Sequence, residues 1–170
     1  MKTVKIIVTF LVILTVIFFA TGLVVKESTY SIEISIDKPL EETFAKFNDI
    51  STISEWIPEY KSIEVTDKKA GVTGSVYRIT VVNKDQEVTI REKILGYVKN
   101  EKVTLYFDRE AFEEIDDFTF KRVGSKTMIT LNSSYQAKSY ILGCVLPYFK
   151  GKFKGADQLA LDNFKVFAEK

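Results

Sequence analysis

The feature that most constrains the fold is an uncharged apolar run that extends from Ile6 to Val25 and ends at Lys26-Glu27. A helix of this length, rising about 1.5 Å per residue, spans roughly 30 Å, which is the hydrocarbon thickness of a bilayer. After Ser28 the chain is charged every few residues and too polar to cross a membrane again. The sequence therefore predicts a single-pass membrane segment over residues 1–29 and one soluble domain over residues 30–170. The residues expected to face lipid are Ile6, Phe10, Leu14, Phe18 and Val25.

Two interpretations of the apolar run differ in what the mature protein keeps. As a transmembrane anchor the whole run stays, with Lys2 and Lys5 holding the N-terminus in the cytoplasm. As a signal peptide its apolar core ends at Phe19, and Ala20-Thr21-Gly22 supplies a small-x-small cleavage pattern. The anchor is favoured because cleavage would leave an apolar mature end, Leu23-Val24-Val25. Both interpretations place the soluble domain outside the cytoplasm.

The composition excludes several classes of function. With 24 basic and 23 acidic residues the chain lacks the excess positive charge that nucleic acid requires, so no nucleic-acid partner is expected. Histidine is absent, which removes the commonest general base, Ser-His and Cys-His nucleophile pairs and most catalytic zinc sites. Cys144 is the only cysteine, so neither an internal disulfide nor a structural zinc site is expected. No cofactor is predicted, and any catalysis would use carboxylates, tyrosines, lysines or a bound water.

An acidic segment in the middle of the chain invites a metal-site interpretation. The segment Asp108–Asp117 contains six carboxylates in ten residues. It lacks the D-x-D-x-D-G spacing that folds a loop around calcium. We therefore expect a solvated hairpin without a metal ion.

Hydrophobic periodicity predicts the order of the elements. Apolar and polar residues alternate from Tyr30 to Asp37, as in a half-buried strand. Asp37-Lys38-Pro39 offers a cap and a first-turn proline for a short helix, and Thr52-Ile53-Ser54-Glu55 has capping-box spacing for a second. From Tyr60 to about Lys138, apolar alternation with turns of two to four residues is typical of an antiparallel meander of six strands.

The last thirty residues have the period of a helix. Pro147 interrupts the pattern, so we expect a kink or a late start there. A strongly bent sheet needs a cover for its concave face, and the long helix is the element available. The prediction is an α+β helix-grip fold in which a curved antiparallel sheet of about seven strands is wrapped around the C-terminal helix. The apolar stripe consists of Leu142, Leu146, Phe149, Phe153, Ala156, Ala160, Phe164 and Phe167.

This order of elements, together with particular residues, resembles the START-like superfamily called SRPBCC from about Tyr30 to Lys170. Bacterial members described as polyketide cyclase or dehydrase family proteins often carry a similar N-terminal hydrophobic helix. The resemblance implies a cavity between sheet and helix that holds an apolar or amphipathic molecule, but it implies no reaction. The matching segments are Ser35-Ile36-Asp37-Lys38-Pro39, Phe44 to Asp49 leading into Trp56-Ile57-Pro58, Gly74-Ser75-Val76-Tyr77, Ser125 to Thr130 and Leu161-Asp162-Asn163-Phe164-Lys165.

Glu92 is the most informative candidate in the expected cavity. It lies between Ile90 and Ile94 on the inward face of a strand, where an ionised carboxylate is costly unless it is paired. It could anchor a polar group of a ligand or act as a general base. The sequence favours a position at a strand end near solvent, because such carboxylates are common near turns. The full set of expected lining residues is Trp56, Tyr77, Ile79, Ile90, Glu92, Leu105, Phe118, Phe149 and Phe153.

Three functional hypotheses follow from these patterns. The first is a membrane-tethered module that binds a hydrophobic small molecule or lipid without covalent catalysis. The second is an enzyme of the cyclase or dehydratase type that uses Glu92 and a tyrosine as acid and base. The third is a structural or partner-binding module whose cavity is filled by its own side chains. A cavity of several hundred Å³ would favour the first two.

Overall fold

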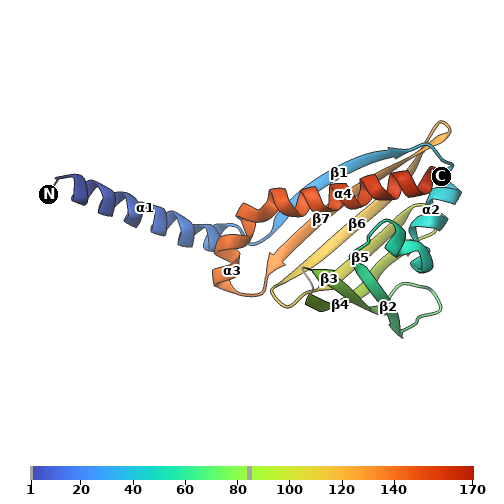
Figure 1. Ribbon diagram of the computed structural model, residues 1–170, viewed down its shortest axis with the longest axis horizontal. Helices are drawn as coiled ribbons and strands as arrows, with labels where there is room; N and C mark the ends of the chain where they lie inside the picture. Colours follow the sequence, from blue (N-terminus) through green and yellow to red (C-terminus); the bar gives the residue numbers. More distant parts are fainter. Residues whose placement is uncertain (1, 84–85) are drawn as a thin grey trace.

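The structure, a computed structural model, describes residues 2–83 and 86–170. It begins with helix α1 (Lys2–Val24), which projects away from the rest of the molecule (Figure 1). Among the described residues α1 is the one helix long and apolar enough to cross a membrane. Of the residues expected to face lipid, Val25 follows the end of α1 and the other four lie within it. Only Val25, Lys26 and Glu27 separate α1 from the first strand.

Seven strands form one antiparallel sheet, as the alternation predicts. Their order in space is β1-β7-β6-β5-β4-β3-β2, so β2 to β7 follow one another as a meander and β1 lies beside β7. The buried residues of β1 alternate strictly with outward ones, which is the pattern of a strand with one face against the core. The strands are β1 (Ser28–Ile36), β2 (Tyr60–Asp67), β3 (Val76–Asn83), β4 (Gln86–Val98), β5 (Lys102–Asp108), β6 (Phe112–Val123) and β7 (Lys126–Ala137).

The two short helices after β1 form where the sequence predicts them, but their first residues differ from the prediction. Helix α2 (Leu40–Phe47) follows Pro39, which is its N-cap and not a first-turn residue. The second is a 3₁₀ helix, η1 (Ile50–Glu55). Its cap is Asp49, whose Oδ1 accepts a hydrogen bond from the Ser51 amide at 3.0 Å. The predicted capping box at Thr52 is wrong because this nearer carboxylate already satisfies the first turn.

The C-terminal helical segment is divided at the predicted proline. Helix α3 (Tyr140–Val145) leads into a 3₁₀ turn, η2 (Leu146–Phe149), and then into the long helix α4 (Lys150–Ala168). Pro147 lies in η2, where it cannot donate the amide hydrogen bond of a continuous helix. Helix α4 runs along the sheet (Figure 1) and buries Leu161, Phe164 and Ala168 against it. The predicted helix-grip fold is confirmed.

The hydrophobic core consists of two clusters of unequal size. The larger lies between β1, β6, β7, α2 and α4, and it contains a group of aromatic rings centred on Phe47. The Phe47 ring lies 4.8 Å from Phe118, 5.2 Å from Phe164 and 5.5 Å from Trp56, measured between ring centroids. The smaller cluster consists of Ile79, Ile90 and Phe107. In the larger cluster the Phe47–Phe164 pair is edge-to-face and the other two pairs are tilted, and such aromatic contacts stabilise a core beyond the area they bury.

Candidate functional site

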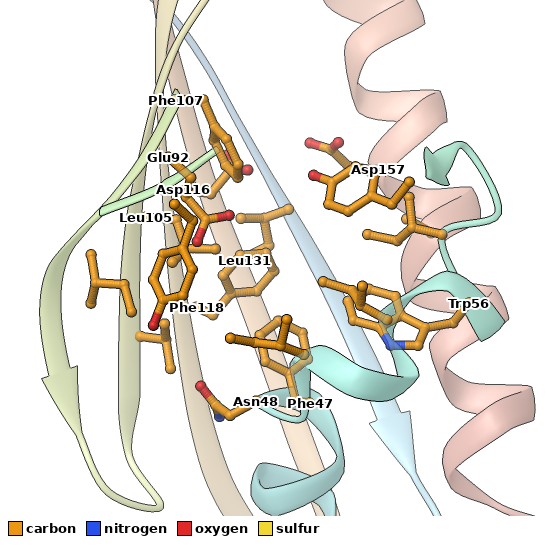
Figure 2. A pocket seen from close by; sticks show the side chains of 18 of the residues that line it. Phe47, Asn48, Trp56, Glu92, Leu105, Phe107, Asp116, Phe118, Leu131 and Asp157 are labelled. Carbon is orange, nitrogen blue, oxygen red and sulfur yellow. The ribbon is translucent and has the colours of Figure 1, made fainter. Parts of the chain in front are cut away.

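A cavity of about 300 Å³ lies between the concave face of the sheet, α4 and η1 (Figure 2). Most of its wall is apolar or aromatic, and the acidic side chains gather at one end. In Figure 2 Glu92, Asp116 and Asp157 lie at the end marked by Phe107, whereas Phe47 lies at the other end. The lining residues are Phe47, Asn48, Ile50, Ile53, Trp56, Ile57, Tyr60, Val72, Tyr77, Glu92, Ile94, Tyr97, Val103, Leu105, Phe107, Arg109, Asp116, Phe118, Leu131, Asp157, Ala160 and Leu161.

Five of the nine residues expected to line the cavity do so: Trp56, Tyr77, Glu92, Leu105 and Phe118. They come from β3, β4, β5, β6 and the residue that follows η1. On the strands, the side chains of alternating residues share one face of the sheet. The curvature of the sheet then brings that face around the cavity.

The other four expected residues lie outside the described lining of the cavity. Ile79 and Ile90 pair with each other across β3 and β4 and pack under Phe107, in the smaller core cluster. Phe153 packs against Tyr135, with ring centroids 4.7 Å apart, and so belongs to the larger core. Phe149 is 41% exposed on η2, because the break at the proline rotates it away from the stripe that continues along α4.

Arg78 lies on β3, the strand next to that of Glu92, but it does not pair with Glu92. Its side chain is exposed on the outer face and forms a 3.5 Å ion pair with Glu64 of β2. Glu92 itself is only partly exposed to solvent and lines the cavity. Burial raises the pKa of Glu92 from 4.5 to about 7. Of the two interpretations of this residue, the inward one agrees with the structure.

The acidic segment between β5 and β6 is not a solvated hairpin. Strand β6 starts at Phe112, and Glu114 and Asp116 are buried, with exposures of 4% and 7%. They follow the same alternation as Phe118 and Phe120, which are also buried. Extending that period two steps towards the N-terminus would have identified both carboxylates as inward. The prediction was wrong because acidic residues were assumed to face solvent.

Arg109 supplies the positive charge at the polar end. Its Nη2 atom lies 2.8 Å from Glu114 Oε2, and its Nε donates to the same oxygen at 2.9 Å. The guanidinium also lies over the Phe107 and Phe112 rings, at 5.5 Å from each centroid. These contacts hold Arg109 near the start of β6 and direct its charge to Glu114.

Asp157 of α4 completes the polar end from the opposite wall. The Tyr30 hydroxyl donates to Asp157 Oδ2 at 2.5 Å. Burial raises the pKa of Asp157 to about 6, against the effect of the hydrogen bond from Tyr30, which favours the ionised form. The ligand atoms of Glu114, Asp116 and Asp157 all lie within 4.8 Å of one another. Sequence reasoning did not select Asp157, because one aspartate in an amphipathic helix carries no local signal.

The tyrosines near the cavity are held in the neutral form. Burial, with the charge of Glu92 second, raises the pKa of both Tyr60 and Tyr77. Tyr135 is buried in the larger core and lies outside the described lining of the cavity. The site thus combines neutral phenols with carboxylates that hold their protons unusually strongly.

The curved antiparallel sheet, the long helix α4 that covers it and the cavity between them define a protein with a helix-grip fold. No protein-family model and no curated protein sequence matches the chain. Solved structures do match it. Ara h 8.0201 aligns over 84% of this chain and 97% of its own, with a TM-score of 0.68 and 13% identity. The Zhui aromatase/cyclase from Streptomyces sp. R1128 aligns over 84% and 94%, with a TM-score of 0.68 and 8% identity.

A third similar structure contains small molecules. It is norcoclaurine synthase from Thalictrum flavum in complex with dopamine and hydroxybenzaldehyde. It aligns over 87% of this chain and 90% of its own, with a TM-score of 0.63 and 11% identity. At these identities the likeness establishes the fold of this chain.

Proposed function

We propose that this protein is a membrane-tethered binding module that holds a hydrophobic small molecule or lipid between its sheet and α4. The observation that carries the proposal is the cavity of about 300 Å³, because a wall of apolar and aromatic side chains with a few polar groups at one end is typical of ligand sites. One similar structure, norcoclaurine synthase, holds two small aromatic molecules.

Packing between α1 and the domain supports the anchor interpretation of the apolar run. The Tyr140 hydroxyl of α3 donates to the Phe19 carbonyl at 2.7 Å, and their rings stack with centroids 6.3 Å apart. Gly22 is buried against Cys144, whose Sγ would lie 2.5 Å from any Cβ at that position. Cleavage at Ala20-Thr21-Gly22 would remove part of this packing. The last turn of α1 therefore acts as a piece of the folded domain.

Such a tether would keep the domain at the membrane surface. With three residues between α1 and β1, the link spans about 10 Å at most. The polar end of the cavity lies towards the start of α4, the end of that helix that follows α3. A molecule exchanged with the bilayer would travel a short distance to this cavity.

Mass spectrometry of organic extracts tests the binding function. The full chain is purified in lipid nanodiscs and its extract is compared with that of an Ala160→Phe variant, whose added ring fills the cavity from α4. Leu159→Phe is the matched control, because Leu159 is exposed on the neighbouring position of the same helix. We expect an apolar compound enriched in the wild-type and Leu159→Phe extracts and depleted from the Ala160→Phe extract. Equal extracts from all three proteins would refute the cavity as a binding site.

A second candidate function, acid–base catalysis on the bound molecule, has one observation in its favour. Glu92 has a pKa of about 7 and lines the cavity with Tyr77, so it can hold or release a proton near neutral pH beside an apolar molecule. Similar structures include an aromatase/cyclase. If Glu92→Gln leaves the turnover of an extracted compound unchanged, Glu92 is not the base. The size of the cavity speaks against the third hypothesis, a domain filled by its own side chains.

A further inference from the structure

The polar end of the cavity holds more negative charge than its basic groups can balance. Glu92, Asp116 and Asp157 line the cavity, and Glu114 lies beside them. Arg109 is the one basic side chain in the described lining, and both of its short contacts are to Glu114. Arg109 also lowers the pKa of Asp116 and Asp157, but among the described residues no cation forms an ion pair with any of the three carboxylates that line the cavity. Burying unpaired carboxylates is costly, and the group usually responds by keeping its proton.

Asp116 is the clearest sign of a missing partner. Its side chain is 7% exposed, and its Oδ1 atom lacks a hydrogen-bond partner among the described residues. Ser133 lies opposite Asp116 across β6 and β7, and its hydroxyl lowers the pKa of Asp116 by less than burial raises it. Figure 2 shows Asp116 on the sheet and Asp157 on α4, on opposite walls at the same end of the cavity. A buried acceptor at a cavity wall calls for a partner, and a donor group of a bound molecule can supply it.

The raised pKa values of these carboxylates agree with an absent cation. Burial raises the pKa of Asp116 well above its usual range, and the charge of Glu114 raises it further. The pKa of Asp157 rises to about 6 through burial. A positive charge between the two would return both to the ionised form, since an opposite charge within a few Å stabilises it.

We propose that the ligand of this cavity carries a protonated amine, which Asp116 and Asp157 bind from opposite walls, and an apolar body that extends towards Trp56 and Phe47. This inference rests on the proposed binding function and names the chemical class of its ligand. An ammonium group donates several hydrogen bonds and a full positive charge in one small volume. The remainder of the wall offers rings and aliphatic side chains, as an apolar body requires.

A divalent metal ion fits the same carboxylates less well. The Arg109 guanidinium already occupies Glu114, and its positive charge would repel a second, doubly charged ion only a few Å away. Tyr30 occupies one oxygen of Asp157 as a hydrogen-bond donor. Calcium needs six to eight oxygen ligands, whereas the rest of the cavity wall is largely apolar. An ammonium group needs only hydrogen-bond acceptors, and Asp116 Oδ1 is an acceptor without a partner among the described residues.

The test is a comparison of three ligands of equal length. Hexylamine, hexanol and hexanoate are titrated at pH 8 into the full chain in nanodiscs, with the fluorescence of Trp56 as the readout. Trp56 is the only tryptophan in the chain and lines the cavity. We expect hexylamine to bind at least about tenfold more tightly than hexanol, because a hydrogen bond to a charged partner contributes at that level. Hexanoate should bind most weakly.

Asp116→Asn should lower hexylamine affinity by about tenfold and leave hexanol affinity unchanged. Asp117→Asn is the matched control: Asp117 is the next residue of β6, and it pairs with Lys102 at 2.9 Å on the outer face. Asp157→Asn repeats the test from α4 and guards against a variant of β6 that fails to fold. Loss of amine affinity in both cavity variants, and not in the control, would support the proposal.

Two kinds of result would overturn the amine proposal. Equal affinity for hexylamine and hexanol would leave the binding function standing and remove the cationic ligand. Stabilisation by calcium alone that Asp116→Asn abolishes, without any preference for hexylamine, would identify a metal site instead. If none of the three probes binds and the organic extracts contain no compound, the binding function fails together with the inference.

Discussion

Glu92 should make the stability of the folded protein depend on pH in an unusual direction. Its pKa rises from 4.5 to about 7 on burial in the folded state, so the native protein holds this proton more strongly than the unfolded chain does. The unfolding free energy must therefore fall as the pH rises from about 4.5 to about 7. At about 1.4 kcal/mol per pKa unit the loss is about 3 kcal/mol, or about 2 kcal/mol after allowing for the part of the side chain that water reaches.

Replacing Glu92 with glutamine tests this reasoning. A glutamine side chain cannot ionise, so the variant should be more stable than the wild type by about 2 kcal/mol at pH 8 and about equally stable at pH 4. The measurement is urea unfolding of the full chain in a mild detergent, followed by the fluorescence of Trp56. Exposed Glu33 on the outer face of β1 provides the matched control, Glu33→Gln. A Glu92→Gln variant that is less stable than the wild type at pH 8, or shifted equally at both pH values, would refute the buried-carboxylate argument.

Three further results are expected. Phe47→Ala should lower the unfolding free energy by about 3 to 5 kcal/mol in the same urea assay, because four aromatic rings lie within 5.5 Å of Phe47; a loss below about 1 kcal/mol would contradict the packing. Gly22→Leu should separate α1 from α3 and expose Cys144 to N-ethylmaleimide, whereas Gly151→Leu, with open space around it, should leave the thiol protected. Hexylamine should bind more weakly at pH 5 than at pH 8, because protonation of Asp157 near its pKa of about 6 removes one acceptor charge; equal binding at both pH values would contradict this role. The charged and titratable groups that face Asp157 are Tyr30, Arg109, Glu114 and Asp116.

Local sequence patterns predicted the architecture because each depends on residues close together in the chain. Alternation predicts a strand, a three-to-four-residue period predicts a helix, and Pro147 predicts the break between α3 and α4. Errors at this level were confined to element starts, such as the first turn of η1. There two capping side chains compete, and the sequence does not say which one the backbone uses.

The residues that line the cavity were only partly predictable, because local sequence patterns do not show how the sheet curves. Trp56, Glu92 and Leu105 were identified from the inward phase of their elements. Ile79 and Ile90 share that phase, yet they lie outside the cavity, because Phe107 covers them where the sheet curves. The alternation of residues predicts which face of the sheet a side chain lies on. The curvature of the sheet then decides which part of that face borders the cavity.

The sequence by itself determined the apolar N-terminal helix, the seven-stranded antiparallel sheet and the long helix that covers it, since these depend on local periodicity. Only the tertiary structure decided where the charges meet. Asp116 lies on β6 and Asp157 on α4, forty-one positions apart in the sequence, and they come close only when α4 crosses the concave face. Arg109 is directed to Glu114 by the turn between β5 and β6. The apolar run thus predicts where the protein resides, whereas the acidic end of the cavity, which supports the proposed ligand class, is a product of folding.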